Sequence, residues 1–217
     1  MRIGILGSGL MGGRLGKIYA QAGHEVVFSY ARTQAKLDEL AREAGNGARA
    51  GNPEEAVRDA DVVLLAVHWT RVDDVLAQAG DLSGKVVLTC SLAMSADDSH
   101  LVIGHTSSGP EALTEKLPGA KVVAAYNTVP GEILFPVFER RSSDWQRPDL
   151  IYAGDDAQAK VTAAGLIRDS GFNPVDLGDL RTARYMEPFG LAVSVLAYGG
   201  KGGPELGYRF MRMHERA

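Results

Sequence analysis

The 217-residue sequence has a single cysteine, Cys90, so an intrachain disulfide is excluded, and this fits a reducing cytoplasm. It has no excess of positive charge: 23 Lys and Arg stand against 27 Asp and Glu, which gives no basic face for nucleic acid. No apolar run reaches the roughly 20 residues of a membrane span, and the first strand starts at the N-terminus, so we expect neither membrane anchor nor signal peptide. These absences favour a cytoplasmic protein whose partners are small molecules.

The sequence also lacks a recognisable set of acid–base or metal-binding side chains. Its histidines, at positions 24, 68, 100, 105 and 214, have no metal-ligand spacing, and we interpret Cys90 as a small buried hydrophobe rather than a nucleophile. We therefore predict no metal site and no catalytic side chain. Reduction of a carbonyl needs a positioned proton donor, whereas hydride transfer between two conjugated rings needs chiefly alignment and exclusion of water.

Glycine is abundant, with 26 residues, and three of them form a GxGxxG pattern near the N-terminus. Gly7, Gly9 and Gly12 lie between a predicted strand at residues 3–6 and a predicted helix at residues 10–22, which is the context of a dinucleotide-binding loop. The N-terminus of that helix would offer free N–H groups and a positive dipole to phosphates. The loop residues predicted to bind the cofactor are Gly7, Ser8, Gly9, Leu10, Met11 and Gly12.

The end of the second strand lacks the carboxylate that an NAD site usually places on the ribose 2′-hydroxyl. Residues 28–31 are Phe, Ser, Tyr and Ala, and Arg32, Thr33 and Lys36 follow. Hydroxyls at Ser29 and Thr33 and a guanidinium at Arg32 suit a 2′-phosphate instead. We therefore predict NADP(H) as the cofactor, against the alternative that Arg32 and Lys36 are solvated surface charges.

Short apolar runs alternate with helical patterns along most of the chain, which predicts an α/β protein with a Rossmann-type, doubly wound, mostly parallel sheet. Asn52 with Pro53, and Asp155, are the predicted helix-start signals. We predict a nucleotide-binding domain at residues 1–178 and a helical segment at residues 179–217. Further strands are expected near Ala48 and at residues 61–67, 85–90, 121–126, 150–153 and 172–176, with helices at 33–44, 53–58, 71–78, 110–117 and 157–169.

The segment after residue 178 has a different pattern. A helix is predicted over residues 179–199, a break at residues 199–204, and a short last helix over residues 205–213. Glu187 and Pro188 are interpreted as helix-start residues, and Arg181, Arg184 and Glu187 as a surface ion-pair set. This segment is too short for a large helical substrate domain, so the partner must be bound by strand-end loops, by this segment or by a second subunit.

Ligands of open α/β sheets bind beyond the carboxyl ends of the strands. The predicted ends carry Val67, His68 and Trp69, then Ser91 and Leu92, then residues 127–130. In that last group Asn127 could hydrogen-bond a carboxamide, and Val129 with Pro130 offers an apolar platform. His68 could contact the cofactor or fill space in a loop. Trp69 could cover the cofactor or pack against a loop.

Together these features resemble the NADPH-dependent coenzyme F-420 reductases, over nearly the whole chain. The shared motifs are the GxGxxG start, residues 67–69, AYNTVP at 125–130, GDD at 154–156, DLGDL at 176–180, ARYMEP at 183–188 and GPELG at 203–207. The sequence departs from the family at residues 90–93, Cys-Ser-Leu-Ala, and follows no recognised pattern over residues 92–108. The resemblance extends to cytoplasmic domains of metalloreductases, which join NADPH to a different acceptor.

The resemblance implies hydride transfer between NADP(H) and a deazaflavin, coenzyme F-420, or a flavin-like acceptor, in a homodimer. It implies nicotinamide neighbours at Val67, His68, Asn127 and Gly131, and 2′-phosphate contacts at Ser29, Arg32 and Lys36. The acceptor residues that we predict are Ser91, Leu92, Asn127, Val129, Pro130, Gly202, Gly203 and Leu206.

Two other functions remain open on the sequence. One is reduction of a small carbonyl or imine, although no lysine here has an asparagine four residues on, the pair that some such enzymes use. The other is a non-enzymatic NADPH-binding regulator in which cofactor occupancy shifts a partner interaction.

Overall fold

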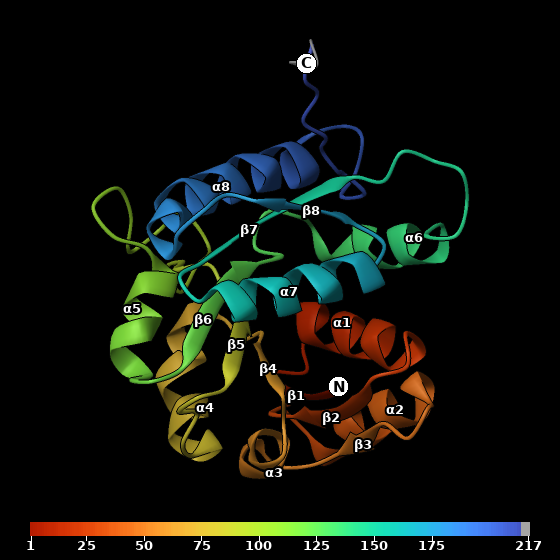
Figure 1. Ribbon diagram of the computed structural model, residues 1–217, viewed down its shortest axis with the longest axis vertical. Helices are drawn as coiled ribbons and strands as arrows, with labels where there is room; N and C mark the ends of the chain where they lie inside the picture. The colour runs from red at the N-terminus through yellow and green to blue at the C-terminus, as the bar shows by residue number, and fades with distance from the viewer. Residues whose placement is uncertain (214–217) are drawn as a thin grey trace.

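The computed structural model describes residues 1–213, which form one eight-stranded sheet between two layers of helices (Figure 1). The strand order is β3-β2-β1-β4-β5-β6-β7-β8, and all neighbours are parallel except β6 and β7. The predicted mostly parallel, doubly wound sheet is therefore confirmed. The strands are β1 (Arg2–Leu6), β2 (Glu25–Ser29), β3 (Arg49–Ala50), β4 (Val62–Leu65), β5 (Val86–Thr89), β6 (Lys121–Ala125), β7 (Asp149–Gly154) and β8 (Asn173–Asp176).

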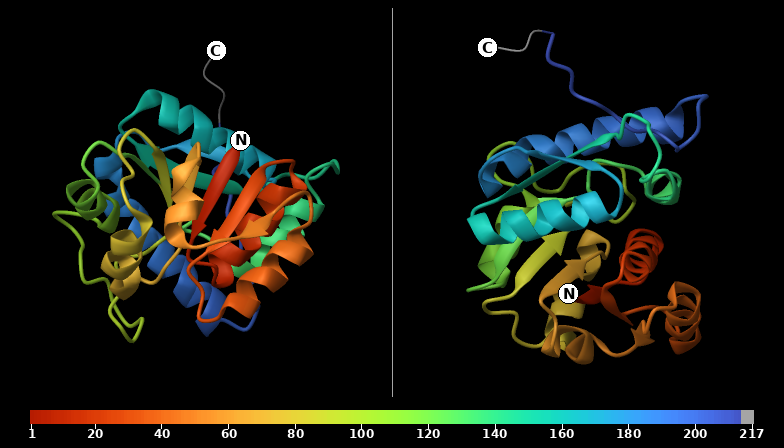
Figure 2. Two further views of the ribbon diagram at one scale, coloured as in Figure 1. Left: turned by 90° about the horizontal axis from the view of Figure 1, so that it is seen from below. Right: turned by 45° about the vertical axis from the view of Figure 1, so that its right-hand side comes forward.

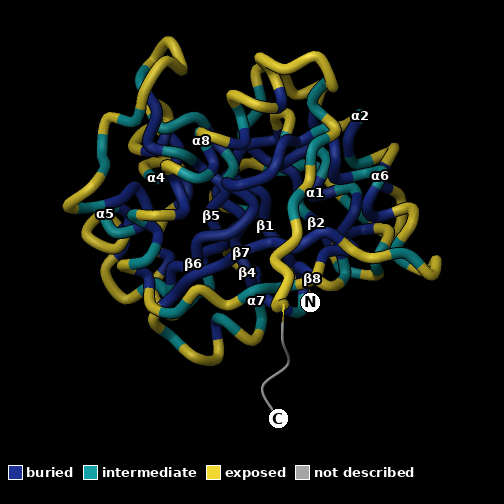
Figure 3. The backbone as a smooth tube through the Cα atoms, turned by 90° about the horizontal axis from the view of Figure 1, so that it is seen from above, coloured by how far each residue is buried: buried dark blue, intermediate teal, exposed yellow. Residues whose placement is uncertain are grey.

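The strands are apolar on both faces because both faces are covered. In β4, Val62 and Leu64 face one hydrophobic cluster while Val63 and Leu65 face the other. The first cluster is closed by α1 (Leu10–Gln21), α2 (Gln34–Ala44), α6 (Leu134–Glu139) and α7 (Ala157–Asp169). The second is closed by α3 (Pro53–Arg58), α4 (Val72–Ala79), α5 (Gly109–Lys116) and the start of α8 (Ala183–Gly199). Figure 3 shows the strands buried at the centre and exposure concentrated in the connecting segments.

Local signals explain where several helices begin. Asn52 caps α3: its side chain accepts from the Glu55 N–H at 2.8 Å while the Glu55 carboxylate accepts from the Asn52 N–H at 2.9 Å, and Pro53 follows in the first turn. The prediction for α7 was wrong by one residue. Asp156 caps it by accepting from the Ala159 N–H at 2.7 Å, whereas Asp155 accepts from the Leu180 N–H.

The predicted helix at residues 205–213 is wrong, because that segment is extended after α8 ends at Gly199. Tyr208 instead forms an isolated bridge with Asp149 of β7, and its hydroxyl accepts from the Ile151 N–H at 3.1 Å. The segment thereby gains backbone hydrogen bonds from the sheet that a single helical turn after a glycine-rich break would lack. The right-hand view of Figure 2 shows this last stretch leading away from α8 toward the C-terminus.

Candidate functional site

A groove of about 1000 Å³ lies at the carboxyl ends of β1, β2 and β4, where the strand order reverses. This switch point is where open α/β sheets bind ligands. Of the described residues that line the groove, five are cations and none is a carboxylate, although the whole chain has a net charge of −4. The lining cations are Arg14, Lys17, Arg32, Lys36 and Arg71.

The glycine loop has the geometry that its sequence predicts. Gly7 has φ +106°, which permits the tight turn, and a Cβ on Gly12 would lie 1.9 Å from the Gly7 carbonyl oxygen. A Cβ on Gly9 would meet no atom within 4 Å, so the space above Gly9 is open to a ligand. No side chain in residues 1–213 caps α1, and its first turn carries no acid, so its N-terminus is free for an anion.

The backbone at the end of β2 is hydrogen-bonded to the glycine loop. The Gly7 N–H donates to the Ser29 carbonyl at 3.2 Å, and the Ser8 N–H donates to the Tyr30 carbonyl at 3.1 Å. The Ser29 hydroxyl is fully buried and donates to the Ile5 carbonyl at 2.7 Å. Ser29 does not line the groove, and in this structure its hydroxyl is occupied within the sheet.

The residues after β2 differ in what they offer a ligand. Arg32 is exposed, lines the groove and has no hydrogen bond or ion pair with any described residue. Lys36 also lines the groove but pairs with Glu39 at 2.9 Å. Thr33 caps α2 by accepting from the Lys36 N–H at 3.3 Å and is outside the groove lining. Of the predicted 2′-phosphate contacts, Arg32 is therefore the most available.

The sequence did not predict four lining residues that have polar or charged side chains, namely Arg14, Lys17, Tyr30 and Arg71. Tyr30 has φ +55°, and its hydroxyl contacts Asp74 and accepts from Arg71 Nε at 3.1 Å. Arg71 also pairs with Asp74 at 3.4 Å. Arg14 and Lys17 come from α1; the buried Nη1 of Arg14 has no hydrogen-bond partner in the described part of the chain. Helical spacing one turn beyond the glycine loop could have found Arg14 and Lys17.

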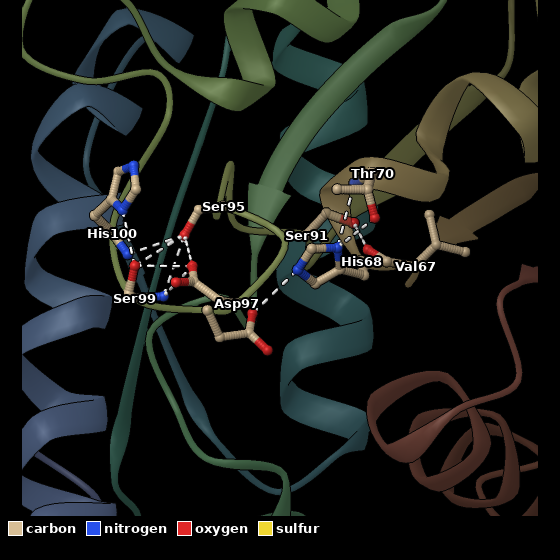
Figure 4. A network of polar contacts seen from close by, with 9 residues as sticks. Val67, His68, Thr70, Ser91, Ser95, Asp97, Ser99 and His100 are labelled. Carbon is tan, nitrogen blue, oxygen red and sulfur yellow. Dashed lines mark hydrogen bonds and ion pairs between the residues drawn. The ribbon is translucent and has the colours of Figure 1, made fainter.

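Val67 and His68, two of the predicted nicotinamide neighbours, line the groove at the end of β4. The His68 Nδ1 lies 2.8 Å from the Thr70 hydroxyl, and its Nε2 lies 3.1 Å from an Asp98 carboxylate oxygen (Figure 4). Both ring nitrogens are thus held by the protein. Trp69 is half-buried and packs toward Gly109 rather than lining the groove.

Asn127 follows β6 and is 5% exposed. Its Nδ2 and Oδ1 are both buried, and neither has a hydrogen-bond partner among residues 1–213. Asn127 is not among the residues that line the groove, but a buried amide without partners is costly and would be satisfied by a group that brings both a donor and an acceptor. Gly131, the other predicted neighbour, packs against α1: a Cβ there would lie 3.1 Å from Met11 and 3.2 Å from Arg14.

Residues 94–108, most of the segment 92–108 that the sequence could not interpret, are held at both ends by one side chain. The buried Glu187 carboxylate accepts from the Ala93 N–H at 3.1 Å and from the Gly109 N–H at 2.8 Å. Burial raises the pKa of Glu187 to about 7, against the opposing effect of these two hydrogen bonds. Between its fastened ends the segment reaches His68 through Asp98, and Figure 4 shows the adjoining Ser95, Asp97, Ser99 and His100 network.

The structure corrects the interpretation of residues 181–188. Pro188 lies inside α8 rather than in its first turn, because the helix begins at Ala183. Glu187 faces the protein interior, and Arg184 pairs with Glu111 at 2.7 Å instead of joining a surface set with Arg181 and Glu187. The helical spacing was compatible with both arrangements, and the tertiary contact decides between them.

The predicted acceptor residues lie next to this region, mostly out of solvent. Ser91 is buried and donates to the Val67 carbonyl at 2.7 Å, and Leu92 is half-buried beside it in the chain. Val129 and Pro130 are buried after β6, while Gly202 is exposed and Gly203 and Leu206 are half-buried after α8. The contact from the C-terminal segment to this edge is made by Tyr208, whose hydroxyl lies 2.8 Å from that of Thr128.

Cys90, the cysteine of the chain, is buried near the site, and its thiol stays protonated at neutral pH. Burial raises the pKa of the Cys90 thiol to about 12. Among the described residues, no three His, Cys, Asp or Glu side chains gather as a metal site; His214 lies outside those residues. Nor is any helix within residues 1–213 long and apolar enough to cross a membrane.

The sheet order, the glycine loop and the groove at the switch point define the class of Rossmann-type dinucleotide-binding proteins. Residues 2–93 of this chain match the family described as NADP oxidoreductase coenzyme F420-dependent. A curated relative, the metalloreductase STEAP3 of Rattus norvegicus, is 29% identical over 189 residues. The match covers 86% of this chain but only 36% of that relative, so the chain spans about a third of its length.

Solved structures share the fold. A candidate F420-dependent NADP reductase from Arthrobacter sp. has a TM-score of 0.85 at 24% identity, with 98% of this chain and 100% of that chain covered. A hypothetical protein from Sinorhizobium meliloti has a TM-score of 0.75 at 27% identity, covering 95% and 94%. A reductive aminase from Aspergillus terreus, in complex with NADPH and ethyl-5-oxohexanoate, has a TM-score of 0.66 at 19% identity, covering 91% and 61%.

Proposed function

We propose that the protein transfers hydride between NADP(H) and a deazaflavin such as coenzyme F-420, or a flavin-like acceptor. The observation that carries the cofactor assignment is the groove: five cations and no carboxylate among its described lining residues, at the switch point of a Rossmann sheet. The family match of residues 2–93 and the NADPH-bound neighbour of the same fold support it.

The residues fit the cofactor along its length. The open space above Gly9 and the start of α1, which no described side chain caps, suit the pyrophosphate. Arg32, which pairs with no described residue, suits a 2′-phosphate dianion. The unpartnered amide of Asn127 suits a nicotinamide carboxamide, which offers one acceptor and two donors. NADPH supplies the hydride when bound; the protein holds the two ends of the molecule apart and fixed.

Ring-to-ring transfer fits the side chains better than carbonyl reduction does. His68 is held at both nitrogens, Cys90 is protonated and buried, and both oxygens of Glu187 accept backbone hydrogen bonds. The alkoxide formed from a carbonyl would have no ready proton donor among these groups. A conjugated acceptor absorbs the charge in its own ring, so alignment and water exclusion suffice.

The cofactor assignment is tested by titrating NADPH and NADH into the wild type and Arg32→Ala. We expect NADPH to bind the wild type about tenfold or more tightly than NADH, and Arg32→Ala to remove most of that preference. Arg58→Ala, a cation on α3 paired with Glu54, is the matched control and should leave both affinities unchanged. Equal affinity of the wild type for the two cofactors would contradict the assignment.

The acceptor assignment is tested by following NADPH absorbance with a panel of coenzyme F-420, FMN, FAD, ferric chelates, and small ketones and imines. Turnover with F-420 above the flavins is the expected result. Preferential reduction of a ketone or imine would favour the carbonyl or imine reductase instead, and tight NADPH binding without turnover on any acceptor would favour a regulator.

We also infer that the protein is a homodimer, as the family resemblance implies. The outward side of α8 supports this inference because Tyr185, Val195 and Leu196 are 68%, 64% and 65% exposed, and the helix's charged residues Arg184 and Glu187 face elsewhere. An apolar face without charge can pair with its own copy without repulsion. Light scattering should give the mass of a dimer for the wild type and of a monomer for Leu196→Glu.

A further inference from the structure

Tyr126, the residue directly before Asn127, has an unusual backbone. It follows β6 at the carboxyl edge of the sheet, is fully buried and has φ +66°. Left-handed backbone of this kind is rare for a bulky side chain and persists only where the surroundings enforce it.

The surroundings that enforce it lie on α7. The Tyr126 hydroxyl donates to the Leu166 carbonyl at 3.1 Å and lies 2.8 Å from the Ser170 hydroxyl, both at the C-terminal end of that helix. The Phe172 ring packs edge-on against the Tyr126 ring with centroids 6.4 Å apart. The phenol is thus anchored to α7, none of whose residues is among those that line the groove.

The main chain after Tyr126 is fixed as well. Gly190 of α8 lies so close that a Cβ there would be 2.3 Å from the Asn127 carbonyl oxygen. The Asn127 side chain is the exception, since both its polar atoms are buried without partners in the part of the chain that is described. The backbone is therefore held on both sides of an amide whose polar atoms are satisfied by no described residue.

We propose that Tyr126 is the positioning residue for Asn127. The anchored phenol holds the left-handed turn, and that turn sets the direction of the Asn127 amide toward the carboxamide of the nicotinamide. Tyr126 touches neither cofactor nor acceptor and acts only through Asn127. The inference rests on the proposed function, because it takes NADP(H) as the ligand.

The experiment compares NADPH with 2′-phospho-ADP-ribose, which keeps the adenosine and phosphate groups and lacks the nicotinamide. Binding of both is measured calorimetrically to the wild type and Tyr126→Phe, which keeps the ring and loses the anchoring hydroxyl. We expect the NADPH dissociation constant to rise about three- to tenfold, the equivalent of one hydrogen bond, and the fragment's to change by less than about twofold.

Tyr152→Phe is the matched control. Tyr152 of β7 is 7% exposed in the same cluster, and its hydroxyl has no hydrogen bond with any described residue, so this variant also loses one phenol hydroxyl. It should leave the NADPH-to-fragment ratio at the wild-type value. If Tyr126→Phe does not fold, Ser170→Ala repeats the test, with a smaller shift in the same direction because the bond to Leu166 remains.

The outcomes separate the two proposals. Loss of NADPH affinity alone in Tyr126→Phe supports the inference. Equal weakening of NADPH and fragment, or no change in either, overturns it, because a merely structural tyrosine would behave so. If the wild type binds NADPH no better than the fragment, the inference fails while the NADP(H) assignment stands; if the wild type binds neither, both fail.

Discussion

Two halves of one edge of the sheet present their polar groups in opposite ways. The first half comprises the carboxyl ends of β1, β2 and β4, and the second comprises the carboxyl ends of β5 and β6. At the first, cations such as Arg32 are exposed along an open groove. At the second, Ser91, Asn127 and Glu187 are 5%, 5% and 1% exposed. Long-range charge attracts a ligand to the first half, whereas the second acts only on a group that has entered and displaced water.

The difference also concerns where the side chains come from. Most of the first half is assembled from residues close in sequence to the glycine loop and the second strand, and Val67, His68 and Arg71 join them from the end of β4 and the turn after it. The second half depends on contacts across the chain, such as Glu187 with Ala93 and Gly109, and Tyr208 with Thr128. Changes in the first half should therefore act locally, while changes in the second should also affect how the fold is held together.

The largest effect should come from Gly12→Ala, which removes the geometric basis of the first half. The new Cβ would lie 1.9 Å from the Gly7 carbonyl oxygen, so α1 must move away from β1. We expect a loss of about 3 kcal/mol in unfolding free energy together with loss of detectable NADPH binding, measured by urea denaturation and calorimetry. Gly165→Ala in α7, where a Cβ meets nothing within 4 Å, should instead stabilise by about 0.5–1 kcal/mol.

That prediction concerns the part of the molecule that the sequence could define. Gly7 and Gly12 perform the predicted roles because a βα turn is decided by neighbours in the sequence. Most element bounds follow for the same reason, since the apolar period and the helix signals are local, whereas the strand order comes from the structure. Tyr30 and Arg71, by contrast, meet 41 residues apart in sequence, and no local pattern indicates that contact.

For the second half, the sequence predicted only which residues follow the strands. Asn127 was expected to face a ligand from its position after a strand, but its burial and lack of partners required the packing of α8. Glu187 was assigned to a helix start because its spacing allowed it. Its real partners, two backbone N–H groups at the ends of residues 94–108, belong to a segment with no periodicity to interpret.

A pH titration of stability would test the second half. The pKa of Glu187 is raised from 4.5 to about 7, so the folded state holds a proton that the unfolded chain has released between those values. Unfolding free energy should therefore fall as pH rises from 5 to 8, by about 2–3 kcal/mol at most from this group, and Glu187→Gln should remove that decline. Urea denaturation at half-unit pH steps measures it.

Glu111→Gln is the control for that titration. Arg184 lowers the pKa of Glu111, so the stability that Glu111 contributes is present above its unfolded-state value and is lost only as pH falls below it. Glu111→Gln should change how unfolding free energy depends on pH in the acidic range and leave its slope between pH 5 and 8 unchanged. A wild-type slope in that range that persists in Glu187→Gln would show that other groups cause it.

A smaller effect is expected at the edge of the first half. Arg71 lines the groove but is held by Tyr30 and Asp74, so its charge is partly neutralised before a ligand arrives. Arg71→Ala should weaken NADPH and 2′-phospho-ADP-ribose alike, by about three- to fivefold, less than Arg32→Ala. Isothermal titration at two salt concentrations checks this, and a change confined to NADPH would place Arg71 on the nicotinamide side instead.

The smallest effect is expected for alkylation of Cys90. Its rate measures how often the ends of β5 and β6 become accessible to solvent. The Cys90 thiol follows β5, is 9% exposed and lies 3.8 Å from the Leu65 carbonyl. Because burial raises its pKa to about 12, only about one thiol in ten thousand is ionised at pH 8, and the thiolate is the reactive form. Alkylation of the native protein at pH 8 should therefore be no faster than the opening of the structure around Cys90. It should reach the rate of the denatured protein only in urea. Rapid labelling of the native protein would mean that the ends of β5 and β6 open readily, and burial would then no longer distinguish the two halves.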